Sequence, residues 1–294
     1  MARFLLAWSL WWPTAVLVGQ TPEFRDRTAA AGLDIVTWSG SVEKPHILES
    51  TGNGVLVLDY DGDGFQDLYF VSAYRLPRQS AAKDQGNGLY RNLGDGTFKD
   101  VTEQAGLKLT VYGHGGSVGD ATGDGLPDIY VTNYGANVLF RNNGDGSFTD
   151  ITAAAGVGDP KWSIGATFFD AEGDGDLDLY VGNYIEASWE EILAAERTRA
   201  WRGKVQVMDG PRGLPESANT FYLNNGDGTF QEATEISGMA EGGMGYSMGV
   251  VSFDFDFDGD LDVYVANDST ANRLYRNRGD ATFEEVATWT GCAY

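Results

Sequence analysis

The chain has 294 residues, 42% of them hydrophobic, and is therefore long enough to bury a substantial core in one or two domains. Its formal net charge of −23 at pH 7 argues against nucleic acid and anionic membrane surfaces as partners, because both require a basic face. Forty glycines indicate many tight turns and hence many short strands, and the single cysteine, Cys292, excludes a disulfide within the chain.

The first twenty residues have the pattern of a secretory signal peptide. Arg3 provides a short basic start, and an apolar run interrupted by a proline covers residues 4–18. This run is too short and too interrupted for a comfortable transmembrane helix; a retained membrane anchor is the alternative. We therefore expect residues 1–20 to be removed on export, with no membrane insertion afterwards. The expected location is extracellular or periplasmic, in association with the cell surface.

Residues 21–294 are expected to be all-β, because one unit of four short segments occurs four times. A strand leads into an acidic loop, a second strand leaves it, a third runs into a Gly-Asp turn, and a fourth follows that turn. In the first unit these segments cover residues 54–58, 67–71, 89–96 and 97–102. Four antiparallel strands that are apolar on both faces are typical of a β-propeller blade, whose faces pack against neighbouring blades.

The four predicted blades cover about residues 52–107, 113–157, 162–239 and 246–290. The third is the longest because it contains an insertion over residues 185–218. We expect a helix over residues 188–202 within this insertion. Insertions of this kind lie on a propeller face, so this one is the best candidate for a partner-contacting surface; a packing cap is the alternative.

An additional copy of the fourth segment precedes the first blade. Residues 24–28, followed by Ala31-Gly32-Leu33, match the outer strands, so the sequence predicts five outer strands for four sets of inner strands. Either four blades close a ring and leave one strand spare, or the chain is a fragment of a larger ring. We favour the fragment.

Each acidic loop has the spacing of a calcium site. Oxygen-bearing side chains stand at loop positions 1, 3, 5 and 9, a glycine stands at position 6, and position 7 offers its backbone carbonyl. Ca²⁺ takes roughly six to eight oxygen ligands, and a short loop can supply them only from alternate residues around a sharp turn. The candidate ligands are Asp59, Asp61, Asp63, Phe65 and Asp67 in the first loop; Asp120, Thr122, Asp124, Leu126 and Asp128 in the second; Asp170, Glu172, Asp174, Asp176 and Asp178 in the third; and Asp254, Asp256, Asp258, Asp260 and Asp262 in the fourth.

An EF-hand is the nearest alternative, but its loop ends in a glutamate at position 12 and is flanked by helices. Position 12 here is Phe70, Val131, Val181 or Val265, and strand-forming residues follow each loop. We therefore expect up to four Ca²⁺ ions, each a structural ion that holds a hairpin. The second site is expected to be the weakest, because it has a threonine in place of a carboxylate. Acidic turns that bind nothing are the alternative.

Catalysis has little support in the sequence. The two histidines, His46 and His114, have no accompanying nucleophile, and the paired carboxylates belong to the acidic loops. The Asn-x-Gly-Asp-Gly sequences have one acid each and are expected to be hairpin turns. Arg278-Gly279-Asp280 lies in one of them, so we do not interpret it as an adhesion motif. We expect no enzyme; the alternative is a lyase or hydrolase that acts on polysaccharide at the propeller face.

The acidic loops, the Leu-Tyr-Arg-Asn-x-Gly-Asp-Gly turns and the Thr-Phe-x-Asp-Val-Thr strands resemble FG-GAP (VCBS-type) repeats of the integrin α-subunit propeller. The order of the blades looks like that of the ASPIC/UnbV family, which includes cartilage acidic protein. Residues 46–50, 201–203 and 210–214 are similar to that family too, and the resemblance covers residues 24–294.

This resemblance implies calcium-stabilised blades, an exported protein, and usually about seven blades followed by a C-terminal ASPIC/UnbV segment. In that family a cysteine pair brackets the Trp-Arg-Gly stretch; this sequence has Ala200 and Asp209 near those places, so the disulfide is not expected. The expected function is that of an exported calcium-binding propeller that acts as a binding, adhesion or scaffolding module. Its partner would be a protein or a glycan, contacted by the blade face and the insertion.

Overall fold

The computed structural model describes residues 23–76, 86–194, 198–201, 205–208 and 210–294. The expected signal peptide, residues 1–20, lies outside these ranges. Within them, no helix combines the length and the apolar character needed to cross a bilayer.

Four antiparallel four-stranded sheets make up most of the described chain, and in each the strands are adjacent in chain order. The predicted four-strand unit is therefore confirmed four times. The first sheet contains β1 (Gly54–Leu58), β2 (Asp67–Val71), β3 (Gly88–Asn92) and β4 (Phe98–Asp100); the second β5 (Gly113–Gly119), β6 (Asp128–Asn133), β7 (Val138–Asn142) and β8 (Phe148–Asp150); the third β9 (Ser163–Phe169), β10 (Asp178–Asn183), β14 (Thr220–Asn224) and β15 (Phe230–Glu232); the fourth β17 (Ser247–Phe253), β18 (Asp262–Asn267), β19 (Arg273–Asn277) and β20 (Phe283–Glu285).

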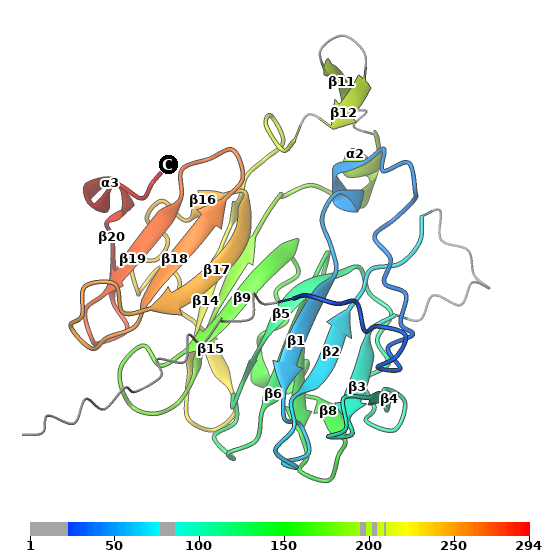
Figure 1. The fold of residues 1–294 in the computed structure, drawn as a ribbon. Coiled ribbons are helices and arrows are strands. Elements are labelled where there is room, and N and C mark those ends of the chain that lie inside the picture. The colour runs from blue at the N-terminus through cyan, green and yellow to red at the C-terminus, as the bar shows by residue number, and fades with distance from the viewer. Residues whose placement is uncertain (1–22, 77–85, 195–197, 202–204, 209) are drawn as a thin grey trace, which may run out of the picture.

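The remaining elements are short. They are η1 (Ile47–Glu49), α1 (Thr152–Ala155), α2 (Trp189–Ala194), β11 (Thr198–Trp201), β12 (Val205–Met208), β13 (Ser217–Ala218), β16 (Met244–Gly245) and α3 (Ala287–Thr290). β11 pairs with β12 in a hairpin that projects away from the sheets in Figure 1.

The helix expected over residues 188–202 is wrong in its length. α2 ends at Ala194, and residues 198–201 form strand β11 instead. The insertion has β-branched or aromatic residues at Thr198, Trp201, Val205 and Val207. These residues favour strands, and a helix of this length would be marginal without tertiary packing.

The sheets stack through their first strands, because β1 packs against β5, β5 against β9, and β9 against β17. Glycines permit the close approach: a Cβ atom on Gly54 would lie 2.9 Å from the Cα of Gly115. The buried side chains between the first two sheets form one apolar cluster, which includes Leu58 and Tyr69 of one sheet and Ile129 of the other. This arrangement is consistent with propeller blades packed face to face.

The described sheets form an open array rather than a closed ring (Figure 1). Val55 and Val57 of β1 are exposed at one end of the array, and Val251 and Phe253 of β17 at the other. The total number of blades stays a prediction.

The outer strand expected over residues 24–28 is not formed, and the Phe24 side chain is 99% exposed. In each of the four sheets the third strand already pairs with its own fourth strand, as β19 does with β20 in the last sheet, so the described sheets offer residues 24–28 no free third strand. The turn around Ala31 that follows these residues makes the same hydrogen bond as the turn that ends the first repeat. The carbonyl of Ala31 accepts a hydrogen bond from the Phe98 amide at 2.8 Å, as that of Ala105 does from Phe148 at 2.9 Å.

Candidate metal centres

Each acidic loop closes a hairpin between the first and second strands of a sheet. The residue before loop position 1 pairs directly with the aspartate at position 9, as Leu58 does with Asp67. The same register joins Phe253 to Asp262 in the fourth sheet. The nine loop residues are therefore held at both ends by a strand pair.

The carboxylate at loop position 1 organises the turn. Asp59 accepts hydrogen bonds from the backbone N–H groups of Asp63 at 3.1 Å and Gly64 at 2.9 Å. The chain can fold back over this carboxylate because Gly62 and Gly64 adopt φ angles of 73° and 88°, which are accessible to glycine. The position-1 aspartates of the other three loops accept backbone N–H groups in the same way.

The aspartate at loop position 9 is buried in all four sheets, with an exposure of at most 1%. In the first loop, Asp67 accepts one hydrogen bond from the Tyr60 amide at 3.1 Å and another from the Asn92 amide at 2.7 Å. The same pair of bonds is made by Asp128, Asp178 and Asp262. This side chain therefore connects the loop to the third strand of its sheet.

The structure brings the carboxylates at positions 1, 3 and 9 together in three of the loops. In each group the ligand atoms lie within 4.8 Å of one another. The groups are Asp59, Asp61 and Asp67; Asp170, Glu172 and Asp178; and Asp254, Asp256 and Asp262.

The position-5 carboxylates lie outside these groups. Asp63, Asp174 and Asp258 each accept the backbone N–H of the residue two positions later. The position-7 residues were expected to contribute carbonyl oxygens, and their side chains pack on the Gly-Asp turn of the same sheet. A Cβ atom on Gly94 would lie 2.6 Å from the Phe65 ring, and one on Gly144 would lie 3.1 Å from Leu126. Metal ligation by residues at positions 5 and 7 stays a prediction.

The second loop differs from the other three. Thr122 donates a hydrogen bond from Oγ1 to Asp128 Oδ2 at 3.3 Å, and Asp124 forms an ion pair with Arg141 at 3.4 Å. Within the described ranges, Asp120, Asp124 and Asp128 do not form a group of three converging carboxylates. The lower affinity expected of this site stays a prediction.

Burial and crowding raise the pKa values of the inner carboxyl groups. Burial raises the pKa of Asp128 to about 6 and also raises the pKa values of Asp67 and Asp262. In the third loop, burial raises the pKa of Glu172, and the neighbouring Asp178 carboxylate raises it further. A bound cation would favour the ionised forms of these same groups.

The donor set fits a hard cation. All the converging atoms are oxygens, the ligand type preferred by Ca²⁺ and Mg²⁺. Asp61 Oδ1 and Glu172 Oε2 are buried and accept no hydrogen bond from the part of the chain that the structure describes. Buried acceptors are normally satisfied, so these two oxygens favour an ion as the missing partner.

An arginine that sequence reasoning missed borders the first loop. Arg91 forms ion pairs with Asp61 at 2.7 Å and with Asp63 at 2.9 Å. The Leu-Tyr-Arg-Asn motif was the available signal, because this arginine precedes the asparagine that contacts the loop. The third sheet has Leu223 at the same place, so the third loop lacks this competing cation.

The Gly-Asp turns are hairpin turns, as expected. In the first turn, Asp95 accepts both the N–H and the O–H of Thr97. Asp280 of the Arg-Gly-Asp sequence makes the same two bonds with Thr282. These aspartates are thus used within their own turns.

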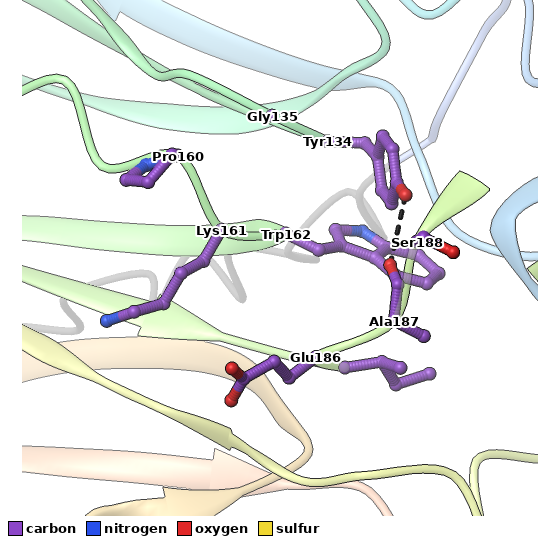
Figure 2. Close-up of a pocket in the computed structure, with 9 residues that line it drawn as sticks. Tyr134, Gly135, Pro160, Lys161, Trp162, Glu186, Ala187 and Ser188 are labelled. Atoms are coloured by element: carbon purple, nitrogen blue, oxygen red, sulfur yellow. Dashed lines mark hydrogen bonds between the residues drawn. The ribbon is translucent and has the colours of Figure 1, made fainter. Parts of the chain in front are cut away.

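A second candidate site is a pocket of about 380 Å³ at the start of the insertion (Figure 2). Its lining includes Tyr134, Lys161, Trp162 and Glu186. Tyr134 donates a hydrogen bond from its hydroxyl to the Ala187 carbonyl at 3.0 Å, the dashed line in Figure 2. The pocket therefore joins the second and third sheets to the insertion.

The helix of the insertion packs against the sheets. Ile192 of α2 is fully buried, and the Trp189 ring lies 5.6 Å from the Tyr134 ring and 6.1 Å from the Tyr112 ring. The sequence left two roles open for the insertion, a partner-contacting surface and a packing cap. The contacts of α2 are those of a packing cap. The pocket beside it gives the described part of the insertion one space of about 380 Å³ that could hold a ligand.

Within the described residues, neither histidine belongs to a group with the acidic-loop carboxylates. His114 is 5% exposed and stacks on Trp162 at 5.7 Å between ring centroids, and burial lowers its pKa to about 3. The His46 backbone N–H donates to Glu49 at 3.0 Å beside η1.

Comparison with known proteins identifies a repeat family. The model of the FG-GAP-like repeat matches residues 59–131, 120–181, 212–265 and 254–293, which together span more than half of the chain. Three of these matches begin at the first aspartate of an acidic loop. No curated protein matches the sequence.

Among solved structures, a similar chain is that of an Agrocybe aegerita lectin described as specifically recognising non-reducing terminal N-acetylglucosamine. The two chains are 18% identical and superimpose with a TM-score of 0.33. The similarity covers 79% of this chain and 64% of the lectin chain. A similarity this low does not indicate a shared ligand.

Proposed function

The chain belongs to the family of FG-GAP-like repeat proteins, and from that premise we propose that it is an exported calcium-binding β-propeller module that binds a protein or glycan partner. The observation that carries this proposal is the convergence of three carboxylates in each of three acidic loops. In this proposal the ions are structural: Ca²⁺ would hold each hairpin, and the blades would present a rigid binding surface.

Calcium is favoured over other cations by the ligands. An all-oxygen set selects against zinc and copper, which prefer nitrogen and sulfur. A flexible loop with several carboxylates suits the irregular coordination of Ca²⁺ better than the strict octahedron of Mg²⁺. Positions 1, 3 and 9 would supply the carboxylates, and calcium at extracellular concentrations would fill sites too weak for the cytosol.

The proposal also includes export of the protein, a ring of about seven blades and a relationship to the ASPIC/UnbV family. The signal-like pattern of residues 1–20 supports export to an extracellular or periplasmic location. The resemblance to ASPIC/UnbV proteins supports a ring of about seven blades. The pocket lined by Tyr134, Trp162 and Lys161 is the proposed contact region, because its aromatic and polar side chains suit a partner segment.

Isothermal titration of the calcium-free protein with Ca²⁺ tests the proposal. We expect saturable binding of up to four ions, and Asp59→Asn and Asp178→Asn should each remove one site. Asp95→Asn, in a Gly-Asp turn that is bonded to Thr97, is the matched control and should leave the stoichiometry unchanged. Absence of calcium uptake by the folded protein would overturn the proposal.

The proposed role is non-catalytic, and the alternative is an enzyme that cleaves polysaccharide. Incubation with a panel of glycans, with and without calcium, distinguishes the two. We expect binding without cleavage products. New reducing ends or unsaturated products would show that the module is an enzyme.

A further inference from the structure

An asparagine at the end of the third strand holds the metal loop of its own sheet. In the second sheet, the Asn142 amide N–H donates to Asp128 at 2.8 Å, and its side-chain Nδ2 donates to the Pro127 carbonyl at 3.4 Å. Its Oδ1 accepts the N–H of Gly144 at 3.0 Å. The residue is buried, with 0% exposure.

The same side chain also reaches the loop of the preceding sheet. Asn142 Nδ2 donates to the carbonyl of Tyr60, at position 2 of the first loop, at 2.8 Å. Asn224 Nδ2 donates to Ala121 of the second loop at 3.1 Å, and Asn277 Nδ2 to Ala171 of the third loop at 2.8 Å. Each of these three asparagines therefore contacts two acidic loops that belong to neighbouring sheets.

A contact at loop position 2 can affect the metal ligands on either side of it. Tyr60 lies between the candidate ligands Asp59 and Asp61, and its own N–H donates to Asp67 at 3.1 Å. A hydrogen-bonded path thus runs from Asp67 through the Tyr60 backbone to the Asn142 side chain, and from the Asn142 backbone N–H to Asp128. It connects candidate ligands of two different loops.

We propose that Asn142, Asn224 and Asn277 are positioning residues that couple the metal loops of neighbouring sheets. An ion bound in one loop orders that loop and the asparagine that contacts it. The asparagine then holds position 2 of the preceding loop, so the second ion has less backbone to order and binds more tightly. The inference depends on the proposed calcium binding and adds that the sites act cooperatively.

The two ends of the array differ from its middle. Asn92 donates from Nδ2 to Gln66 of its own loop at 3.0 Å, and no contact with a second loop is described for it. In the fourth loop, the carbonyl of Phe255 receives no asparagine from a following sheet within the described ranges. The first three loops are therefore held from both sides and the fourth from one.

The test measures binding at the first loop while the second loop is altered. Terbium(III) replaces calcium in this test, and its emission is sensitised by nearby tyrosines. The part of the terbium emission that is lost in Tyr60→Phe is sensitised by Tyr60 and therefore reports on the first loop. Asn142→Ala should weaken terbium binding at the first loop roughly tenfold, the effect of one lost hydrogen bond, although every ligand of that loop is unchanged. Asn143→Ala is the matched control, because the hydrogen bonds described for the Asn143 side chain stay within its own hairpin, to Ser147 and Thr149.

A double-mutant cycle separates coupling from a purely structural role. Asp120→Asn, which disables the second loop, should weaken the first loop in the natural background and have no further effect in the Asn142→Ala background. Equal effects in both backgrounds, or an unchanged first loop in Asn142→Ala, would overturn the inference. If Asn142→Ala does not fold, the Asp120→Asn arm alone decides whether the loops are coupled. If the natural protein binds neither terbium nor calcium, it is the proposed function that fails.

Discussion

Phe257 in the fourth acidic loop has a φ angle of 64°, and Gly173, at the same position of the third loop, has a φ angle of 74°. The first and second loops also have glycine there, Gly62 and Gly123. A side chain with a Cβ atom is strained in this left-handed region, and the Phe257 side chain, 90% exposed, has little packing to offset the strain.

Phe257→Gly should therefore raise the free energy of unfolding by about 1 kcal/mol. Urea denaturation of the calcium-free protein measures the change. The reverse comparison is Gly173→Ala, which should lower the free energy of unfolding by a similar amount. A less stable Phe257→Gly protein would show that the phenylalanine makes contacts that outweigh its strain.

Removal of calcium should lower the melting temperature. A ligand that binds only the folded state stabilises it by about 2.7 kcal/mol per site at a concentration of about one hundred times Kd. We expect a chelator to lower the melting temperature and excess calcium to restore it, as measured by differential scanning calorimetry. The difference in melting temperature between the calcium-bound and the calcium-free protein should be smaller in Asp59→Asn and unchanged in Asp95→Asn. A melting temperature that does not respond to the chelator would contradict structural calcium.

Protonation of His114 should destabilise the protein in mild acid. Burial lowers the folded-state pKa of His114 to about 3, below the ordinary value of 6.5, so the unfolded chain binds the proton more readily. The stability due to the neutral imidazole is therefore complete above about pH 6.5, and it falls by about 1.4 kcal/mol per pH unit below that value, down to about pH 3.

His114→Phe isolates this effect, because both ring nitrogens lack a described hydrogen-bond partner and an aromatic ring can replace the imidazole beside Trp162. We expect the variant to lose less stability than the natural protein between pH 6.5 and pH 4, as measured by chemical denaturation across that range. His46→Gln is the control. Equal pH profiles for His114→Phe and the natural protein would refute the assignment.

Gly54→Ala should push the first two sheets apart. The added Cβ would lie 2.9 Å from the Cα of Gly115 and 3.1 Å from the His114 carbonyl. These are backbone atoms that cannot rotate away, so we expect a loss of about 1–3 kcal/mol in the free energy of unfolding.

Gly249→Ala is the matched control for this substitution. Gly249 stands at the same place in β17, and its added Cβ would come no closer than 4.0 Å to a neighbouring atom, Ala266 Cβ. We expect at most a small change in stability. Equal losses for Gly54→Ala and Gly249→Ala would show that the cost arises within the strand rather than between the sheets.

The repeated motifs predicted the local structure well. The four-stranded sheets, the acidic loops between their first two strands and the Gly-Asp hairpins all form as the spacing indicated. Two local predictions were wrong. The helix of the insertion ends at Ala194, and residues 24–28 form no strand, because each third strand of the described sheets already pairs with its own fourth strand. In the insertion, the local residues of β11 and β12 favour strands over a continued helix. For residues 24–28, the outcome depended on a partner strand that the local pattern does not contain.

The sequence by itself determined the hairpins, the acidic loops and the carboxylates that converge in three of those loops, because these contacts are made between residues of the same repeat. Only the tertiary structure decided which loops share an asparagine and which faces of the sheets are covered. Asn142 and Tyr60 are 82 residues apart, and Asn277 and Ala171 are 106 residues apart. Such contacts exist only once the blades stack, and the stacking depends on glycines at the first strands that let neighbouring backbones approach.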